Sequence, residues 1–205
     1  DFCLSRGLGD VYKRQVTLSG PRTGPDQGAA PLPQSPQVIG AKAYNLGVVR
    51  SLGFRVPDYV LLAYEEARRV ASRPEGRSSR QLVQRVLAQL GVSNGDKLAV
   101  RSSAVSEDRA DGSCAGAYRS LLNVGRGQVA AALRDFVDSN RLGRDGTPYR
   151  GSVIVQRMVQ ADCAGVCLTR EARTGHGDAV IIEMAAGGNV GVTGGTVCPD
   201  RVVID

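Results

Sequence analysis

The spacing of apolar residues changes near residue 140, and this change limits the fold more than any other feature of the sequence. Up to that point, apolar side chains recur at helical spacing in the segments 40–53, 65–71, 80–90 and 128–139. Short strand patterns lie between them at 59–62 and 98–100. Beyond it the patterns are those of strands only, at 152–156, 165–169, 179–183 and 201–204. Helices mixed with strands, followed by strands alone, predict an α+β fold of two subdomains.

Glycine and serine predict where some of these helices begin and end. Gly53 and Gly91 follow helical patterns and suit the left-handed cap that often terminates a helix. Ser78 or Ser79 is expected to cap the start of the helix over 80–90 with its hydroxyl.

The first 36 residues predict no packed structure. Residues 3–15, CLSRGLGDVYKRQ, resemble translated sequencing-adapter read-through, and proline stands at positions 21, 25, 31, 33 and 36. A segment of this composition buries little surface. We therefore expect a disordered or artefactual arm over 1–36 and an ordered domain over 37–205.

Composition restricts the class of protein. The net charge is +6, but Lys and Arg are spread along the chain and only 4% of residues are aromatic, so a nucleic-acid interface is not favoured. The sequence has no apolar run of the ~20 residues that cross a bilayer and no signal peptide pattern, which predicts a cytoplasmic protein. The five cysteines predict reduced structural thiols, with Cys114 and Cys198 as small core residues.

Two cationic residues are candidates for binding an anion. Lys42 lies at the start of a predicted helix, where free backbone N–H groups also favour a phosphate; a solvated lysine is the alternative. Arg101 directly follows a predicted strand and precedes the hydroxyls of Ser102 and Ser103, a set of donors suited to phosphate oxygens. The alternative for Arg101 is an ion pair with the acidic residues at 107–108 that holds a loop together.

Two further segments can complete such a site. The loop 111–120, DGSCAGAYRS, is rich in small residues that let a backbone approach a polyphosphate, although an ordinary surface turn is the alternative. The run 153–159, VIVQRMV, is a buried strand pattern whose end can line an adenine slot. Its alternative is a core strand with Met158 as a filler.

Taken in order, seven segments resemble the N-terminal nucleotide-binding domain of the dikinases that include pyruvate phosphate dikinase, phosphoenolpyruvate synthase and rifampin phosphotransferase. The resemblance covers about residues 37–205. It rests on IGAKAYNLG, FRVPDYVLL, LAVRSSAVSED, GSCAGAYRSLLNV, VIVQRMV, AGVCLTREARTG and GGTVCPDRVVID.

This resemblance implies a partial ATP-grasp-like domain whose two subdomains hold ATP between them. By position, it implies phosphate contacts from Lys42 and Arg101 and a phosphate-covering loop at Gly116 and Ser120. It implies further that Gln156 lies at the other side of the nucleotide, with Met158 and Val159 near the adenine.

The resemblance also implies a reaction that this chain does not complete alone. Enzymes of this family use ATP and Mg²⁺ to phosphorylate a histidine on a separate swivelling domain, which then passes the group to pyruvate or an antibiotic. The metal-binding carboxylate and glutamine are expected beyond Asp205, as are the swivelling domain and the acceptor domain. We therefore expect no catalytic residue within this chain and no turnover by it, and we expect His176 to be a solvated loop residue.

Several departures from the family pattern leave an alternative open. Ala117 and Arg119 stand where the family has an amide and an acid, and residues 187–190, GGNV, replace Gly-Leu-Gly-Glu. The spans from Lys42 to Arg101 and from Ser120 to Gln156 are short for the family. These differences favour, as the alternative, a degenerate non-catalytic module that binds a nucleotide or a partner.

Overall fold

The computed structural model describes residues 35–106, 108–109, 112–113, 118–143, 146–169 and 180–204, with the backbone alone at 108–109 and 112–113. These residues form a mixed α+β structure, as the sequence predicts, with antiparallel sheets of four, three and two strands. They divide after Met158 into two compact units. Residues 1–34 of the expected disordered arm, Cys114 and His176 lie outside the described residues, and the arm was predicted to end too late, because α1 begins at Pro36.

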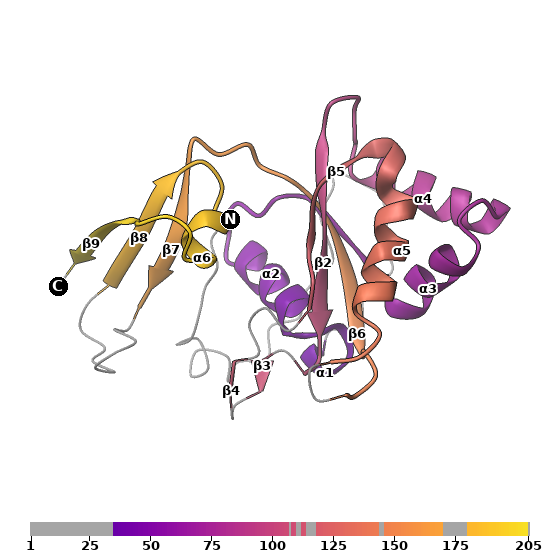
Figure 1. Cartoon of the computed structure of the whole chain (residues 1–205), viewed down its shortest axis with the longest axis horizontal. Helices are drawn as coiled ribbons and strands as arrows, with labels where there is room; N and C mark the ends of the chain where they lie inside the picture. Colours follow the sequence, from indigo (N-terminus) through magenta and orange to yellow (C-terminus); the bar gives the residue numbers. More distant parts are fainter. Residues whose placement is uncertain are drawn as a thin grey trace. The chain divides into compact units, whose positions relative to one another are not determined.

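A four-stranded antiparallel sheet forms the centre of the first unit (Figure 1). Its strand order is β1-β6-β2-β5. The strands are β1 (Tyr59–Ala63), β6 (Gly151–Arg157), β2 (Lys97–Ala104) and β5 (Leu121–Gly125). The register sets Tyr59 and Ala99 on either side of Gln156, so these three side chains belong to one face of the sheet.

Helices cover both faces of this sheet, with α2 on one side and α3, α4 and α5 on the other (Figure 1). The single helix predicted over 40–53 is α2 (Ala41–Ser51), and a short helix α1 (Pro36–Ile39) precedes it. The opposite face carries α3 (Tyr64–Ser72), α4 (Arg77–Gln89) and α5 (Val129–Ser139). The turn η2 (Arg126–Gln128) leads into α5, and β3 (Asp108–Arg109) pairs with β4 (Gly112–Ser113).

The larger core lies between the sheet and helices α3 to α5. It contains alternate residues of β2 and β6, among them Leu98, Val100 and Val155, packed against Leu133 and Phe136 of α5. Burying each such side chain contributes about 1.5–3 kcal/mol. Tyr149 joins this core, with its ring edge-on to those of Tyr118 and Phe136 and tilted against that of Tyr64.

A smaller core lies on the other face of the sheet. Ile39 and Ala43 from the α1–α2 segment pack against Tyr59 of β1 and Ile154 of β6. Gly40 joins the two helices with a φ of 81°, and a Cβ at this position would overlap the carbonyl oxygen of Ser103. The absence of a side chain at Gly40 therefore lets the helix junction lie directly on β2.

The second unit contains a three-stranded antiparallel sheet in the order β7-β8-β9. These strands are β7 (Cys163–Leu168), β8 (Val180–Ala186) and β9 (Asp200–Ile204), and a short helix α6 (Val190–Thr193) lies between the last two. Gly165 of β7 passes so close to β8 that a Cβ there would overlap the carbonyl oxygen of Glu183. All five residues of β9 are exposed in this structure.

Two local predictions are wrong and two are confirmed. The serine cap is wrong because α4 begins earlier, at Arg77 after Gly76, and the Ser79 hydroxyl instead donates to the carbonyl of Arg73 at 2.7 Å. The core position of Cys198 is also wrong, because this thiol is exposed ahead of β9. Gly53 and Gly91 do adopt positive φ after their helices.

In the part of the chain that is described, no helix has the length and apolarity needed to span a bilayer.

Gly40→Ala tests the close packing of the α1–α2 junction. We expect the free energy of unfolding to fall by about 2 kcal/mol or more, because the new methyl group meets backbone atoms and φ is positive. Gly127→Ala is the matched control, since a Cβ at Gly127 meets no atom within 4 Å. Urea denaturation of both variants measures the difference, and equal stability would contradict the packing described here.

Candidate functional site

Arg101 and Gln156, both predicted site residues, contact each other. Arg101 lies in β2 opposite Ile154 of β6, so its side chain belongs to the sheet face that α1 and α2 cover. Its Nη1 donates to Oε1 of Gln156 at 3.0 Å. The buried Gln156 amide also donates from Nε2 to the carbonyl of Pro57 at 3.3 Å. Because an amide is neutral, this contact orients the guanidinium without neutralising its charge.

Ser103 links the helix that carries Lys42 to the strand that carries Arg101. Its hydroxyl donates to the carbonyl of Ile39 at 2.7 Å and accepts the N–H of Ala43 at 2.9 Å. The Ser152 hydroxyl of β6 donates to the same Ile39 carbonyl at 2.6 Å. Ala43, the neighbour of Lys42, is therefore hydrogen-bonded to Ser103, which lies two residues from Arg101 on the same face of the sheet. The Lys42 side chain is half-buried.

The expectation that the hydroxyls after Arg101 serve as phosphate donors is wrong for Ser103. This side chain is fully buried, and its hydroxyl is used by Ile39 and Ala43. Its backbone N–H donates to the hydroxyl of Tyr149 at 3.0 Å, and that hydroxyl donates in turn to the carbonyl of Ser152. Ser102 is also fully buried. The sequence pattern alone does not distinguish a serine whose hydroxyl is exposed to a ligand from a buried serine whose hydroxyl bonds backbone groups.

Met158 and Val159 lie at the division between the two units. The backbone N–H of Met158 donates to the carbonyl of Lys97 at 2.9 Å, and its sulfur accepts the N–H of Asn123 at 3.0 Å. Asn123 is the one non-glycine residue with positive φ in the described part of the chain, at 58°. Met158 is thus fixed to β2 and β5 rather than packed as a core filler. Val159, in the second unit, is exposed.

The small-residue loop over 111–120 is described at its end, from residue 118, and as backbone alone at 112–113. Gly116 lies outside the described residues, as do the side chains at 107–108 that were weighed as partners of Arg101. Ser120 is exposed and directly precedes β5, whose first residue Leu121 pairs with Val100. Ser120 therefore leaves the sheet beside the position of Arg101. The loop end is held by Asn140, which accepts the N–H of Arg119 at 2.7 Å and donates to its carbonyl.

Sequence reasoning missed a second arginine, which lies over the ring of Tyr59, the β1 partner of Gln156. Arg50, near the end of α2, forms an ion pair with Asp58 at 2.7 Å, and its guanidinium lies 5.6 Å from the centre of the Tyr59 ring. Tyr59 pairs with Gln156 across β1 and β6 and is buried. Burial raises the pKa of the Tyr59 hydroxyl, and the charge of Arg50 partly offsets this increase. The sequence signal that could have found Arg50 is its spacing of two helical turns from Ala43, which places both residues on the same side of α2.

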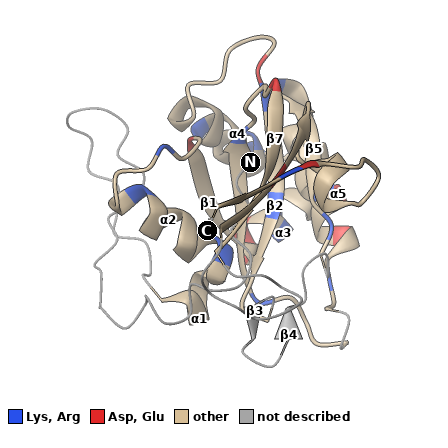
Figure 2. Cartoon of the chain, turned by 90° about the vertical axis from the view of Figure 1, so that its left-hand side faces the viewer, with Lys and Arg blue, Asp and Glu red and all other residues tan. Residues whose placement is uncertain are grey.

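Other features of the described residues do not form a site here. No group of three His, Cys, Asp or Glu side chains within them can hold a metal ion. A shallow hollow of about 290 Å³ opens beside α4, away from the face that carries Arg101, and is lined by Gln84, Leu87, Ala88, Gly91, Val92 and Arg126. Lys and Arg occur on several helices and strands rather than on one element (Figure 2).

Comparison with protein families finds one that covers more than half of the chain. Residues 77–205 match the family described as pyruvate phosphate dikinase, AMP/ATP-binding domain. The match includes Arg101, Ser120, Gln156 and Met158. Lys42 lies outside it, so its role rests on the IGAKAYNLG segment and on the Ser103 contacts.

Individual relatives match over about 120 residues. The phosphoenolpyruvate synthase of Helicobacter pylori is 38% identical over 120 residues, which is 52% of this chain and 15% of that enzyme. The probable phosphoenolpyruvate synthase of Staphylothermus marinus is 37% identical, over 53% of this chain and 14% of its own length. The prodigiosin synthesizing transferase PigC of Serratia marcescens is 36% identical, over 57% of this chain and 14% of its own. The chain thus spans about one seventh of the length of these relatives.

Tyr59→Phe tests whether burial beside Gln156 raises the pKa of the Tyr59 hydroxyl, through the pH dependence of stability. Because the folded pKa of Tyr59 lies above its usual value of 10.0, the neutral phenol stabilises the fold below pH 10. That contribution is lost as the pH rises from 10 through the folded pKa. We expect Tyr59→Phe to lose less unfolding free energy than the wild type between about pH 9 and 11. Equal losses in urea denaturation would show that Tyr59 is not shifted.

Proposed function

Because this chain belongs to the pyruvate phosphate dikinase AMP/ATP-binding domain family, we propose that its first unit binds the phosphates of ATP with Lys42 and Arg101. The observation that carries this proposal is the Arg101–Gln156 contact on the sheet face that α2 covers. The described partner of this guanidinium is an amide, so an anion that binds there meets a positive charge already held in place. The Ser103 contacts support Lys42 as a second cation on the same face.

The remaining residues receive roles that follow from their position. We assign Gln156 to orienting Arg101, because its amide is fixed at Pro57 and at Nη1 of the guanidinium. Ser120, together with Gly116, is assigned to the loop over the phosphates, since it leaves the sheet beside Arg101. Met158 and Val159 are assigned to the adenine side. This division sets cations at one side of the nucleotide and an apolar surface at the other.

We further propose that the domain serves a longer phosphotransferase of ATP-grasp-like fold. Such an enzyme passes a phosphoryl group from ATP to a histidine on a separate domain and then to pyruvate or a similar acceptor. Two of the relatives described above are phosphoenolpyruvate synthases, and their length leaves room for those domains. The described residues offer no carboxylate set for Mg²⁺, so we assign no metal-dependent step to them. This chain alone is expected to bind ATP without turnover.

The alternative is a degenerate binding module without phosphotransfer. It is favoured by the sequence at 187–190, where Val190 is an exposed apolar residue at the start of α6 in place of the family acid. The downstream reading frame separates the two proposals. Continuation into a histidine-bearing domain supports the phosphotransferase, and a stop shortly after Asp205 supports the module.

ATP titration of Lys42→Ala and Arg101→Ala tests the phosphate site. We expect each variant to weaken ATP binding by about tenfold or more, because a charge-assisted contact of ~1.5–3 kcal/mol is lost. Arg134→Ala is the control, since Arg134 is exposed on α5 and its loss lowers the net charge equally. Calorimetry provides the dissociation constants. ATP binding that is indifferent to both substitutions would refute the proposal.

A further inference from the structure

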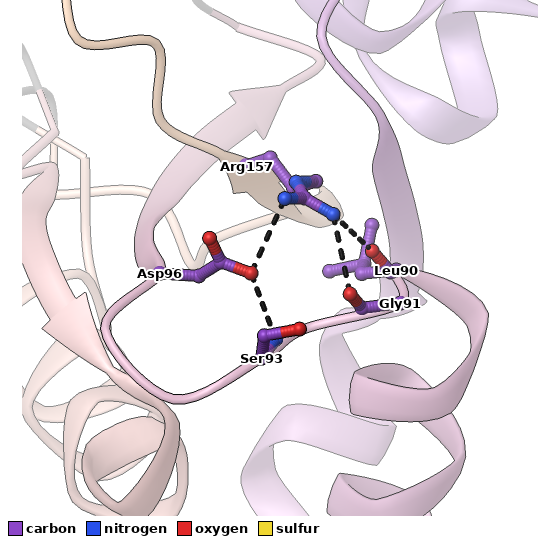
Figure 3. Close-up of polar contacts among 5 residues, drawn as sticks. All are labelled: Leu90, Gly91, Ser93, Asp96 and Arg157. Atoms are coloured by element: carbon purple, nitrogen blue, oxygen red, sulfur yellow. Dashed lines mark hydrogen bonds and ion pairs between the residues drawn. The ribbon is translucent and has the colours of Figure 1, made fainter.

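Arg157 separates Gln156 from Met158 in the chain, and its side chain extends to the opposite face of the sheet. Successive side chains of a strand point to opposite faces, so Arg157 points away from Arg101 and toward the helices. There it reaches the carboxyl end of α4, as Figure 3 shows. No role in the proposed nucleotide site has been given to it so far.

The guanidinium of Arg157 joins three separate groups. Its Nη1 donates to the carbonyls of Leu90 at 3.0 Å and Gly91 at 3.3 Å, which end α4. Its Nη2 forms an ion pair with Asp96 at 3.2 Å (Figure 3). Asp96 in turn accepts the N–H of Ser93 at 2.7 Å with the same oxygen. Carbonyls at the end of a helix carry partial negative charge, so a planar cation with several donors suits this position.

These contacts connect the side chain of Arg157, through Asp96 and Lys97, to the backbone of Met158. Asp96 directly precedes Lys97, the first residue of β2, and the Lys97 carbonyl accepts the N–H of Met158 at 2.9 Å. The backbone N–H of Arg157 donates to the carbonyl of Asp58 at 2.8 Å, which ties the same point to the start of β1. The position of Met158 thus depends on the 91–96 loop, and Arg157 holds that loop.

We propose that Arg157 is a positioning residue for the adenine side of the nucleotide site. This inference rests on the proposed function, because Met158 matters only if a base lies beside it. Without the guanidinium, the 91–96 loop loses its link to β6, and Lys97, whose carbonyl holds Met158, keeps its pairing with Gly125 of β5 but loses the support of this loop. Arg157 does not touch the nucleotide in this proposal.

The phosphate side does not depend on this anchor. Lys42 and Arg101 belong to the other face of the sheet, where Ser103 and Ser152 fix the α1–α2 junction through Ile39. Loss of Arg157 should therefore weaken contacts to the base and leave contacts to the phosphates intact. A general loss of folding would weaken both, whereas the loss of one distant positive charge is screened by salt and should change both only slightly.

The experiment compares ATP with inorganic tripolyphosphate, which has the phosphates but no base. We expect Arg157→Gln to weaken ATP binding by about fivefold or more and tripolyphosphate binding by less than about twofold. Arg157→Lys should lie between the wild type and Arg157→Gln, because an ammonium keeps the charge but not the planar set of donors. Arg134→Gln is the control with the same charge change, and it should alter neither constant appreciably.

The two methionines give a second readout without any ligand. The sequence contains Met158 and Met184 alone, one in each unit. In a protein labelled at the methionine methyl groups, Arg157→Gln should shift the NMR signal of Met158 and leave that of Met184 in place. If Arg157→Gln does not fold, Asp96→Asn removes the ion pair alone and should give the same division between the two ligands, with smaller changes.

The outcomes separate the two proposals. If the wild type binds both ligands and Arg157→Gln weakens both equally or neither, the positioning role is overturned and the proposed function stands. If the wild type binds neither ligand, the proposed function is overturned and this inference with it. Selective loss of ATP binding, together with a shifted Met158 signal, supports the inference.

Discussion

The Ser103 hydroxyl is the contact on which the candidate site depends. It donates to the carbonyl that ends α1, which the Ser152 hydroxyl also bonds, and it accepts an N–H in the first turn of α2 that would otherwise be buried without a partner. Gly40 makes this possible because no Cβ separates the helix junction from β2. An unmade hydrogen bond in such a place costs about 1–3 kcal/mol. Together with Ser152 and the small core around Ile154, the Ser103 side chain determines where α2, and the lysine it carries, lies on the sheet.

The two faces of the first sheet have different tasks. One face supplies stability, since alternate residues of β2 and β6 pack with α3, α4 and α5 into the larger core. The other face is only partly covered by the small core around Ile154, and it carries Arg101 and Gln156. Because successive side chains of a strand alternate, each strand contributes to both faces. β6 shows this clearly, with Gln156 on the face proposed to bind the nucleotide and Arg157 at the end of α4.

The sequence predicted the regular elements better than the contacts between them. Strong apolar periodicity identified the helix over 128–139 and the strands over 98–100 and 152–156, and the structure confirms all three. The start of α4 was predicted wrongly because Ser79 has a partner in the preceding loop, which local spacing does not reveal. The roles of Ser103 and Tyr149 could not be predicted for a similar reason. Their partners lie 60 and 46 residues away along the chain, respectively, and only the folded sheet brings them together.

The aromatic cluster around Tyr149 determines which part of the chain is followed by absorption and fluorescence measurements. The chain has no tryptophan, and residues 159–205 contain no tyrosine or phenylalanine either. Its aromatic absorption and intrinsic fluorescence therefore originate entirely before residue 159, with Tyr64, Tyr118 and Tyr149 packed as neighbours. The sheet of β7, β8 and β9 contributes no aromatic signal. Five of the six tyrosines lie in the unit that carries Arg101, so a melting curve followed by tyrosine emission reports on that unit and not on this sheet.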